Sequence, residues 1–436
     1  MRQRAFRYVY VKGADAELEL SADHEYLPLT ARGAFSCSEP LFDKIYSAAE
    51  YTFHLNAREA LLDGIKRDRW VWSGDAFQSA RINRYLYADK DIEQRTLIGL
   101  IGRSPIEQHI NTIIDYSFLW IISLYEHYTT YGDVDFLRRI YPITRELLDF
   151  SEIRFNSDGF IEGIGDDWTF IDWSEIEKVG AISAEQMLMI GVYGAMAELS
   201  AALGLDASEF ISKKDALTKR VNEFYWNEEK GAYIDSYATG NAHVTRHANI
   251  FAVIFGIADD RQSKSILKNV LMNDSINPIT TPYFEGYELD ALAILGEFDA
   301  VEEKLRSYWG GMIELGATTI WEEYDPAMHG IEHYAMYGNK YEKSLCHAWG
   351  ANPIYLFGRY YLGVSPASAG YETFLVKPRL GGLENIDGSV PVKDGTVRVR
   401  FDGKELFVLS DVSGGALVFG GKEYPLEKNV PFVLSL

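Results

Sequence analysis

Residues 38–62 read SEPLFDKIYSAAEYTFHLNAREALL, and this stretch decides the fold class. Leu41, Ile45, Ala48 and Phe53 recur at helical spacing behind a Ser-Glu start signal, which predicts an amphipathic helix. The same spacing returns in segment after segment as far as residue 362. Further helices are predicted near residues 74–88, 92–104, 117–131, 135–154, 181–203, 208–225, 243–256, 261–272, 285–296, 299–314 and 342–361.

These segments make about a dozen helices, and turns such as YGDVD and NSDG separate several of them. Sequential helical hairpins in this number have one compact arrangement, an inner and an outer ring whose long loops form a cup at one end. An open solenoid is the structural alternative. No strict repeat of about 34–47 residues is visible, which disfavours the solenoid.

The two ends of the chain have the period-two alternation of strands. Near the start, Phe6, Tyr8 and Tyr10 alternate with Arg7 and Val9. A second alternation, Leu18 and Leu20 with Glu17 and Glu19, follows a turn signal at Gly13–Asp15. Near the other end, TVRVRF, LFVLSDV, ALVFGG and PFVLSL are predicted strands, and Asp402-Gly403 is a hairpin signal.

The predicted fold is therefore mainly α, a helical toroid with β structure at both ends. We expect a β segment at residues 1–36, a helical barrel at 37–363 and a small antiparallel β-sandwich at 364–436. A strand is predicted within the first few residues of the chain. We therefore expect the chain to be the later part of a longer protein, or a trimmed form of one. The first segment would then be a remnant of an upstream β domain.

Composition narrows the classes of function. The net charge of −22 would repel a phosphate backbone and disfavours nucleic-acid binding. No apolar run approaches the ~20 residues that a membrane span needs, and MRQRAFRYVYVKG lacks the apolar core of a secretory signal.

Cys37 and Cys346 are interpreted as buried thiols, and a single disulfide between them stays open as an alternative. The compartment and the oligomeric state stay open.

The first loop-like segment that could carry chemistry is DGIKRDRWVWSGDA, residues 63–76. It places Asp63, Asp68 and Asp75 beside two tryptophans, and burial against rings raises the pKa of a carboxyl group. Glycoside hydrolysis needs such a protonated acid at the leaving oxygen. The alternative is structural, because Asp75 could cap the next helix and Arg67 could neutralise neighbouring acids.

Two later loop-like segments also place acidic residues next to tryptophan. GIGDDWTFIDWSE, residues 163–175, sets Asp167 beside Trp168, a pair suited to sugar hydroxyls and an apolar sugar face, although a loop packing its own tryptophans gives the same string. GATTIWEEYDP, residues 316–326, places Glu322 directly after Trp321. His347 follows in SLCHAWGANP, where a lone histidine is more often structural than catalytic.

Other chemistries fit poorly. His243 and His247 could share a helix face, but neither an HExxH motif nor a cysteine pair accompanies them, so no metal site is predicted. The sequence has no Walker loop, no GxGxxG after a strand and no GxSxG elbow. We therefore expect no cofactor.

Taken together, the segments resemble the bacterial α-L-rhamnosidases, family 78 of the glycoside hydrolases. The likeness covers nearly the whole chain, in order: FRYVYVKG, GAFSCSEPLFDKIY, DGIKRDRWVWSGDA, GDDW, GATTIWEEYD, SLCHAWGANP and GYETFLVKPRL. The resemblance implies an (α/α)6 toroid, a carbohydrate substrate and hydrolysis with inversion, and it implies β domains upstream.

The resemblance also implies roles for individual residues. Asp68 falls on the family's general acid and Glu322 on its general base. The implied substrate-binding residues are Asp63, Arg67, Trp72, Asp75, Asp167, Trp168, Trp321 and His347. One departure stands out, since the family usually has Glu where this chain has Asp68, in a run like DCPQRERLGWTGD. The shorter side chain sets the acid back by roughly 1 Å, which can cost ~100-fold in rate.

We therefore predict an inverting hydrolase that removes terminal α-L-rhamnose, or a related deoxy-sugar, with Asp68 as acid and Glu322 as base. Two alternatives remain. An (α/α)6 polysaccharide lyase or glucuronyl hydrolase would enlist His109, Tyr116 and Tyr283. A catalytically inactive sugar-binding homologue would explain the departure at Asp68.

Overall fold

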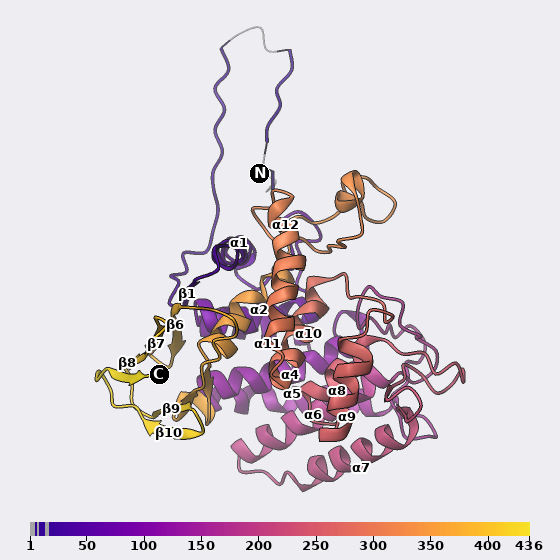
Figure 1. The fold of residues 1–436 in the computed structure, drawn as a ribbon. Coiled ribbons are helices and arrows are strands. Elements are labelled where there is room, and N and C mark those ends of the chain that lie inside the picture. Colours follow the sequence, from indigo (N-terminus) through magenta and orange to yellow (C-terminus); the bar gives the residue numbers. More distant parts are fainter. Residues whose placement is uncertain (1–4, 7, 14–16) are drawn as a thin grey trace.

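The computed structural model of the chain describes residues 5, 6, 8–13 and 17–436, and Figure 1 shows a helical body flanked by a β region. The helices of the body are α1 (Pro40–Asn56), α2 (Ser73–Leu86), α3 (Lys90–Ile101), α4 (Ile114–Tyr131), α5 (Val134–Glu152), α6 (Ser183–Ala202), α7 (Ser208–Tyr225), α8 (Arg246–Ile254), α9 (Asp260–Ile266), α10 (Pro282–Leu295), α11 (Phe298–Lys304), α12 (Gly310–Glu314) and α13 (Pro353–Leu356).

Short π-helical and 3-10 turns extend or join these helices. The π-helical turns are η2 (Leu267–Leu271), η3 (Leu305–Trp309) and η6 (Phe357–Tyr361). The 3-10 turns are η1 (Ile110–Thr112), η4 (Gly330–Tyr334), η5 (Ala348–Ala351) and η7 (Ala369–Tyr371). Within the described residues, no helix is both long enough and apolar enough to cross a bilayer.

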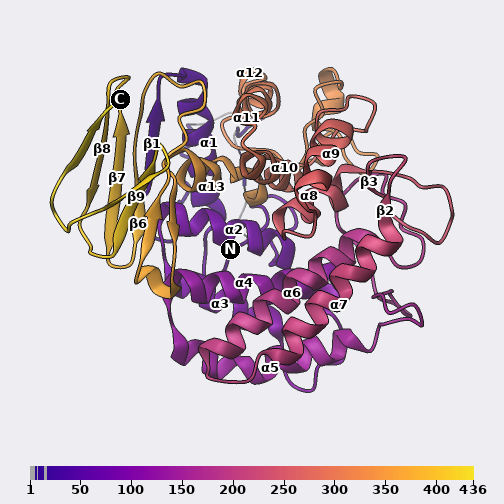
Figure 2. The ribbon, with the colours of Figure 1, turned by 60° about the horizontal axis from the view of Figure 1, so that its bottom comes forward.

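The predicted helical toroid is confirmed. Helices α2, α4, α6, α8, α10 and α13 contact one another in that order, and α13 returns to α2, so they close an inner ring. The helices that alternate with them in sequence lie outside this ring, as α5 and α7 do in Figure 2. The burial pattern explains the division, because α4 and α6 are buried around most of their circumference while α5 and α7 are buried along one face.

Two helix boundaries differ from the prediction. The first helix was expected to run toward residue 62 but ends at Asn56, because the chain turns there into the loop that leads to Asp63. The last helix was expected from residue 342, yet helical structure begins only at Ala348. The backbone N–H groups of Lys343 and Ser344 donate to the Tyr334 carbonyl and the Glu322 carboxylate, which joins this non-helical segment to η4 and to the loop that carries Glu322.

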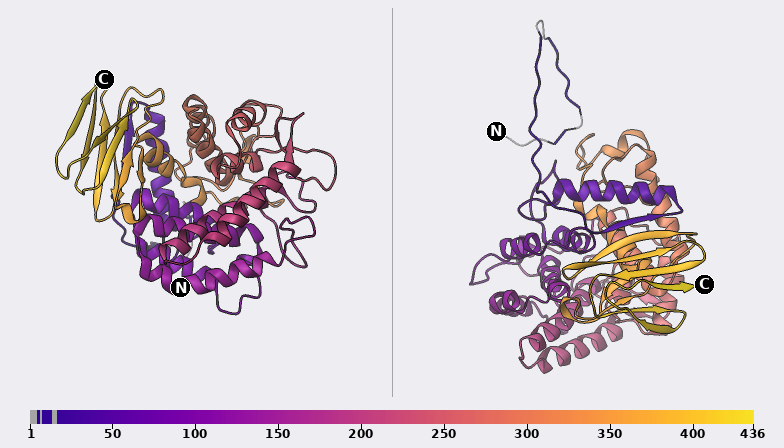
Figure 3. Two further views of the ribbon diagram at one scale, coloured as in Figure 1. Left: turned by 90° about the horizontal axis from the view of Figure 1, so that it is seen from below. Right: turned by 90° about the vertical axis from the view of Figure 1, so that its left-hand side faces the viewer.

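The C-terminal region consists of two sheets, seen at the edge of the helical body in Figure 3. Their strands are β4 (Val364–Pro366), β5 (Phe374–Val376), β6 (Ile386–Val392), β7 (Gly395–Phe401), β8 (Glu405–Ser410), β9 (Gly415–Phe419), β10 (Lys422–Pro425) and β11 (Phe432–Ser435). One sheet has the order β1-β6-β7-β8-β11, in which β1 is Ala34–Cys37, and the other has the order β10-β9-β5-β4. The pairs are antiparallel, as predicted, except the parallel pair β5–β9.

The start of the chain departs from the prediction. The described residues before Ala34 form no strand, and Phe6, Tyr8 and Tyr10 are exposed there. Arg7 and part of the predicted turn at Gly13–Asp15 lie outside the described residues. An alternating segment needs a neighbouring strand to complete its hydrogen bonds, and among the described residues none flanks this one. Figure 1 shows it extending away from the body.

Strand β1 (Ala34–Cys37) is the exception, and it belongs to the far end of the chain. It pairs antiparallel with β6, with Phe35 opposite Gly388. The first strand of the structure is thus an edge strand of the C-terminal sheet. This pairing ties the entrance of the helical ring to the β region that follows it.

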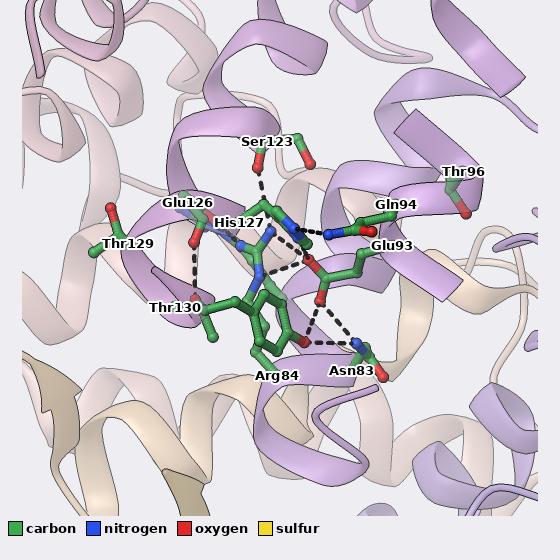
Figure 4. A network of polar contacts seen from close by, with 12 residues as sticks. Asn83, Arg84, Glu93, Gln94, Thr96, Ser123, Glu126, His127, Thr129 and Thr130 are labelled. Atoms are coloured by element: carbon green, nitrogen blue, oxygen red, sulfur yellow. Dashed lines mark hydrogen bonds and ion pairs between the residues drawn. The ribbon is translucent and has the colours of Figure 1, made fainter. Parts of the chain in front are cut away.

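A buried polar network joins the helices α2, α3 and α4, and Figure 4 shows its side chains. Glu93 lies at its centre and accepts hydrogen bonds from Arg84, Asn83 and the Tyr131 hydroxyl, while His127 Nδ1 lies 3.1 Å from its Oε2. Burial alone would raise the pKa of Glu93, but the charge of Arg84 and the hydrogen bonds of His127 and Asn83 together outweigh burial and hold that pKa below its ordinary value. Glu93 is therefore a buried carboxylate that its partners keep charged.

Candidate active site

The loop after Asp63 is folded by the carboxylate of Asp63 itself. This carboxylate is buried and accepts the backbone N–H of Asp68 at 2.7 Å and that of Trp70 at 2.9 Å. The Asp63 carbonyl also accepts the N–H of Ala348 at 2.6 Å, which joins the loop to the start of η5. A carboxylate can accept several such bonds, so this one residue fixes the path of the loop.

Asp68 is placed by this loop at the mouth of a pocket. Its side chain is 45% exposed, and Trp72 Nε1 donates to its Oδ2 at 3.2 Å. Arg67 approaches the other oxygen, with 3.5 Å between Nη1 and Oδ1. The Asp68 carboxyl group therefore keeps one side open to solvent while two neighbours hold its orientation.

Glu322 reaches the same pocket from the loop between α12 and η4 and is buried. Its side chain is 4% exposed and pairs with Arg67 through Nη2 and Oε2. The N–H of Ser344 donates to the same Oε2 at 3.1 Å, and the Glu322 N–H donates back to the Ser344 carbonyl at 2.9 Å. One guanidinium group thus contacts both Asp68 and Glu322.

Asp75 and His347 lie at the floor of the pocket. Asp75 is in the first turn of α2, and His347 Nε2 lies 3.1 Å from its Oδ1. Burial raises the pKa of Asp75 to about 6. Burial by itself would lower the pKa of His347, but the hydrogen bond to Asp75 and the charge of Glu322 raise it above its ordinary value. The pair therefore holds a proton near neutral pH.

An aromatic wall formed by Trp168, Phe170 and Trp173 lines another side of the pocket. Two buried carboxyl groups anchor the loop that carries it. Asp115 accepts the N–H groups of Phe170 at 2.9 Å and Ile171 at 3.1 Å.

The second anchor is Glu185, which accepts the Thr169 hydroxyl at 2.6 Å. Burial raises the pKa of Glu185 to about 8. The loop also contains Ile171 at a φ of 51°, a conformation that a β-branched residue rarely adopts. The anchors below the loop hold this unfavourable turn in place.

The structure brings eight of the ten predicted site residues to one pocket with about 420 Å³ of empty space. These are Asp63, Arg67, Asp68, Trp72, Asp75, Trp168, Glu322 and His347. Their individual roles in catalysis and binding remain predictions, but their convergence is a finding.

The other two predicted residues do not line this pocket. Asp167 forms an ion pair with Arg154, with 3.0 Å between Oδ2 and Nε, and accepts the N–H of Ile164. Trp321 is buried against Tyr324 and Tyr334. Neither Asp167 nor Trp321 lines the pocket, although their neighbours Trp168 and Glu322 do.

Six further residues line the pocket: Ile113, Tyr116, Phe170, Trp173, Tyr337 and Trp349. Phe170, Trp173 and Trp349 belong to the segments singled out from the sequence, so proximity to the motif residues was a usable signal. Tyr337 belongs to none of them, and nothing in its local sequence pointed to the pocket. His109, enlisted for the lyase alternative, is buried next to Ser117 and does not line the pocket.

The family model of the bacterial α-L-rhamnosidase six-hairpin glycosidase domain matches residues 30–361. The chain belongs to this family. The match covers the helical ring and all the pocket-lining residues, so the family resemblance noted from the motifs is confirmed.

Two curated relatives are α-L-rhamnosidases. The protein from Formosa agariphila is 22% identical over 299 residues, which is 61% of this chain and 30% of the relative. The protein from Streptomyces avermitilis is 22% identical over 420 residues, which is 86% of this chain and 37% of the relative. The chain thus spans about a third of the length of these family members.

Solved structures share the fold. A family 78 rhamnosidase of Bacillus sp. GL1 superposes with a TM-score of 0.79 at 23% identity, covering 90% of this chain and 43% of that one. A rhamnosidase from Klebsiella oxytoca with rhamnose bound gives a TM-score of 0.63 at 24% identity, covering 74% and 64%. The helical ring of this chain is therefore the ring of the rhamnosidase family.

Proposed function

We propose that the chain is the catalytic part of an α-L-rhamnosidase, which removes a terminal α-L-rhamnose by hydrolysis with inversion. The observation that carries the proposal is the meeting of Asp68 and Glu322 in one pocket, bridged by Arg67. Membership of the rhamnosidase family supports the choice of sugar, and so do the names of the two curated relatives.

The two carboxyl groups differ in environment, and this difference assigns their roles. Asp68 lies at the open mouth, where a leaving group can depart, and donates its proton to the glycosidic oxygen as the C–O bond breaks. Glu322 lies deep and accepts a proton from a water molecule, whose oxygen attacks the anomeric carbon from the opposite face. The products are a free sugar of inverted anomeric configuration and the protonated leaving group.

Arg67 and the Ser344 N–H both donate to Oε2 of Glu322. We therefore assign the other oxygen, Oε1, to the attacking water. Asp75, His347 and Trp349 close the pocket at its floor, which favours a terminal sugar over an internal one. Inverting glycosidases hold their two carboxyl groups ~6.5–9.5 Å apart, and we expect that separation in the complex with substrate.

The test is hydrolysis of 4-nitrophenyl α-L-rhamnoside by the chain and by two amide variants, Asp68→Asn and Glu322→Gln. We expect the wild type to release nitrophenol and rhamnose, and each amide to lower kcat by at least about 10³-fold. Proton NMR during the first turnovers should show the β-anomer appearing first. Appearance of the α-anomer first would contradict inversion.

Glu323→Gln is the matched control for the base. Glu323 is the next residue, but its carboxylate pairs with the buried Lys343 at 3.2 Å and does not line the pocket, so we expect the folded variant to keep a near wild-type kcat although its stability falls. Wild-type rates in Asp68→Asn or Glu322→Gln would refute the assignment. Two other results would refute the proposed function itself: an unsaturated product that absorbs in the ultraviolet, or rhamnose binding without any release of nitrophenol.

A further inference from the structure

The pocket has a closed floor and an open mouth, and the leaving group must pass through the mouth. Asp75 and His347 close the floor and are buried, whereas Asp68 at the mouth is 45% exposed. If Asp68 protonates the glycosidic oxygen, as proposed above, the group attached to that oxygen lies beyond Asp68 on its solvent side. The residues that are exposed at the mouth are then the ones that contact the leaving group.

Three exposed aromatic side chains line the pocket, Trp168, Trp173 and Tyr337, and the last two meet at this mouth. Tyr337 is 56% exposed and Trp173 is 38% exposed, and both line the pocket. Their ring centroids are 6.1 Å apart with an interplanar angle of 75°, so the rings form a corner. A single exposed ring is ordinary, but a corner of two exposed rings inside a pocket offers flat apolar surface beside the proposed catalytic carboxyl groups, where a ligand can stack.

Tyr337 is held at this corner by an unusual turn. Met336 and Asn339 exchange two backbone hydrogen bonds of 2.9 Å, which leaves Tyr337 and Gly338 as a two-residue loop. Both have positive φ, 50° and 80°, as a type I′ turn requires. Asn and Gly are favoured at such positions, and a bulky aromatic residue there is an outlier. Unfavourable backbone conformations of this kind concentrate at functional sites.

Arg67 fixes the ring itself. Its guanidinium carbon lies 4.9 Å from the Tyr337 ring centroid, and the same guanidinium contacts Asp68 and Glu322. The orientation of the Tyr337 ring is thus set by the residue that orients the catalytic pair.

We infer that Tyr337 and Trp173 form the leaving-group subsite of this pocket and bind a leaving group that has a flat apolar face. Such a face belongs to an aromatic ring or to the CH side of a pyranose, and the two sources share the same stacking chemistry. The inference rests on the proposed hydrolysis of α-L-rhamnosides. It makes Tyr337 and Trp173 determinants of specificity for the leaving group rather than for the rhamnose.

The experiment compares three substrates that differ only in the leaving group. α-L-Rhamnosyl fluoride has no ring to stack, 4-nitrophenyl α-L-rhamnoside has an aromatic ring, and a rhamnosyl-α-1,2-glucose disaccharide has a pyranose. Tyr337→Asn removes the ring yet keeps a residue that suits the turn. Trp173→Ala removes the other side of the corner and lies on a different segment, which guards against failure of one variant to fold.

We expect kcat/KM for the nitrophenyl substrate to fall about tenfold more than kcat/KM for the fluoride in each variant, mainly through KM. If kcat/KM for the disaccharide falls in parallel, the subsite binds both aromatic rings and pyranose faces. If kcat/KM falls for only one of the two substrates, the subsite binds only that kind of leaving group. Tyr341→Asn is the matched control, because Tyr341 lies on the same segment, is 72% exposed and does not line the pocket.

Equal losses on all three substrates would overturn the inference, because they would mean that Tyr337 acts only by supporting Arg67. The absence of any loss would overturn it as well. Turnover of the fluoride by the wild type reports on the proposed function independently. If the wild type hydrolyses the fluoride but the variants do not discriminate among leaving groups, the proposed function stands and the subsite inference fails.

Discussion

Asp75 and His347 are 272 positions apart in the chain, yet Oδ1 of one lies 3.1 Å from Nε2 of the other at the floor of the pocket. Asp75 comes from the first turn of α2 and His347 from the residue before η5, so their contact closes the ring of helices across the site. Because both groups are buried and titratable, the stability that their contact contributes depends on pH.

The first prediction concerns this pair. The pKa of His347 is raised in the folded protein, so its contribution to stability is fully present below its ordinary value near 6.5 and is lost as pH rises through the folded value. We expect His347→Gln to lower the free energy of unfolding, by more at pH 6 than at pH 9. Urea unfolding across this range measures the difference, with the exposed His24→Gln as control. A difference in unfolding free energy between the wild type and His347→Gln that grows toward pH 9 would contradict the ion pair.

The second prediction concerns Arg67, which contacts both proposed catalytic carboxylates. Lysine keeps the positive charge but lacks the planar fork, so it cannot orient Asp68 and Glu322 together. We expect Arg67→Lys to lower kcat for an aryl rhamnoside by about 10–100-fold. Steady-state kinetics tests this, with Arg103→Lys at the surface as the matched change. Unaltered kcat would show that the two carboxyl groups are oriented without Arg67.

The third prediction concerns the departure from the family at Asp68. Glutamate would carry the carboxyl group about one methylene, roughly 1 Å, further into the pocket. We expect Asp68→Glu to raise kcat by up to about tenfold while KM changes less. The measurement is kcat on an aryl rhamnoside. A fall in kcat would mean that Trp72 and Arg67 are arranged around the shorter acid.

The fourth prediction concerns Glu185 below the aromatic wall. Burial raises its pKa to about 8, so the folded state keeps the carboxyl protonated where the unfolded chain ionises. Stability from this group is therefore present below pH ~4.5 and is lost progressively up to pH ~8. We expect Glu185→Gln, a neutral group of similar shape, to gain stability relative to the wild type across that window. Thermal unfolding at pH 5 and pH 8 measures the stability of Glu185→Gln relative to the wild type. A variant that is less stable than the wild type at pH 8 would contradict the raised pKa.

The fifth prediction concerns Glu93, the centre of the buried network in Figure 4. Glu93→Gln leaves Arg84 buried without its full counter-charge, and breaking a buried pair in this way costs about 3–5 kcal/mol. Because the pKa of Glu93 is lowered, the advantage of the wild type should shrink as pH falls below about 4.5. Chemical denaturation measures both effects, with the exposed Glu107→Gln as control. A loss below 1 kcal/mol would show that the network carries little stability.

Much of the fold could be predicted because it depends on local periodicity. Helix spacing places a helix wherever apolar residues recur along one face, and the predicted segments match α1 to α12 apart from their ends. The prediction failed where strand formation depended on distant pairing. The alternation of Phe6, Tyr8 and Tyr10 belongs to none of the sheets among the described residues, whereas β1 pairs with β6, about 350 residues later.

The sequence by itself determined the ring of helices, the β region after it and the motif segments from which most of the pocket is built. Only the tertiary structure decided which side chains of those segments enter the pocket. Asp167 pairs with Arg154 and Trp321 packs on Tyr324, so neither lines the pocket, whereas Trp173, Trp349 and Tyr337 do, the last from a turn that carries no motif. The physical reason is that periodicity acts between neighbours in the chain, whereas a pocket is defined by side chains that meet only after distant helices have packed.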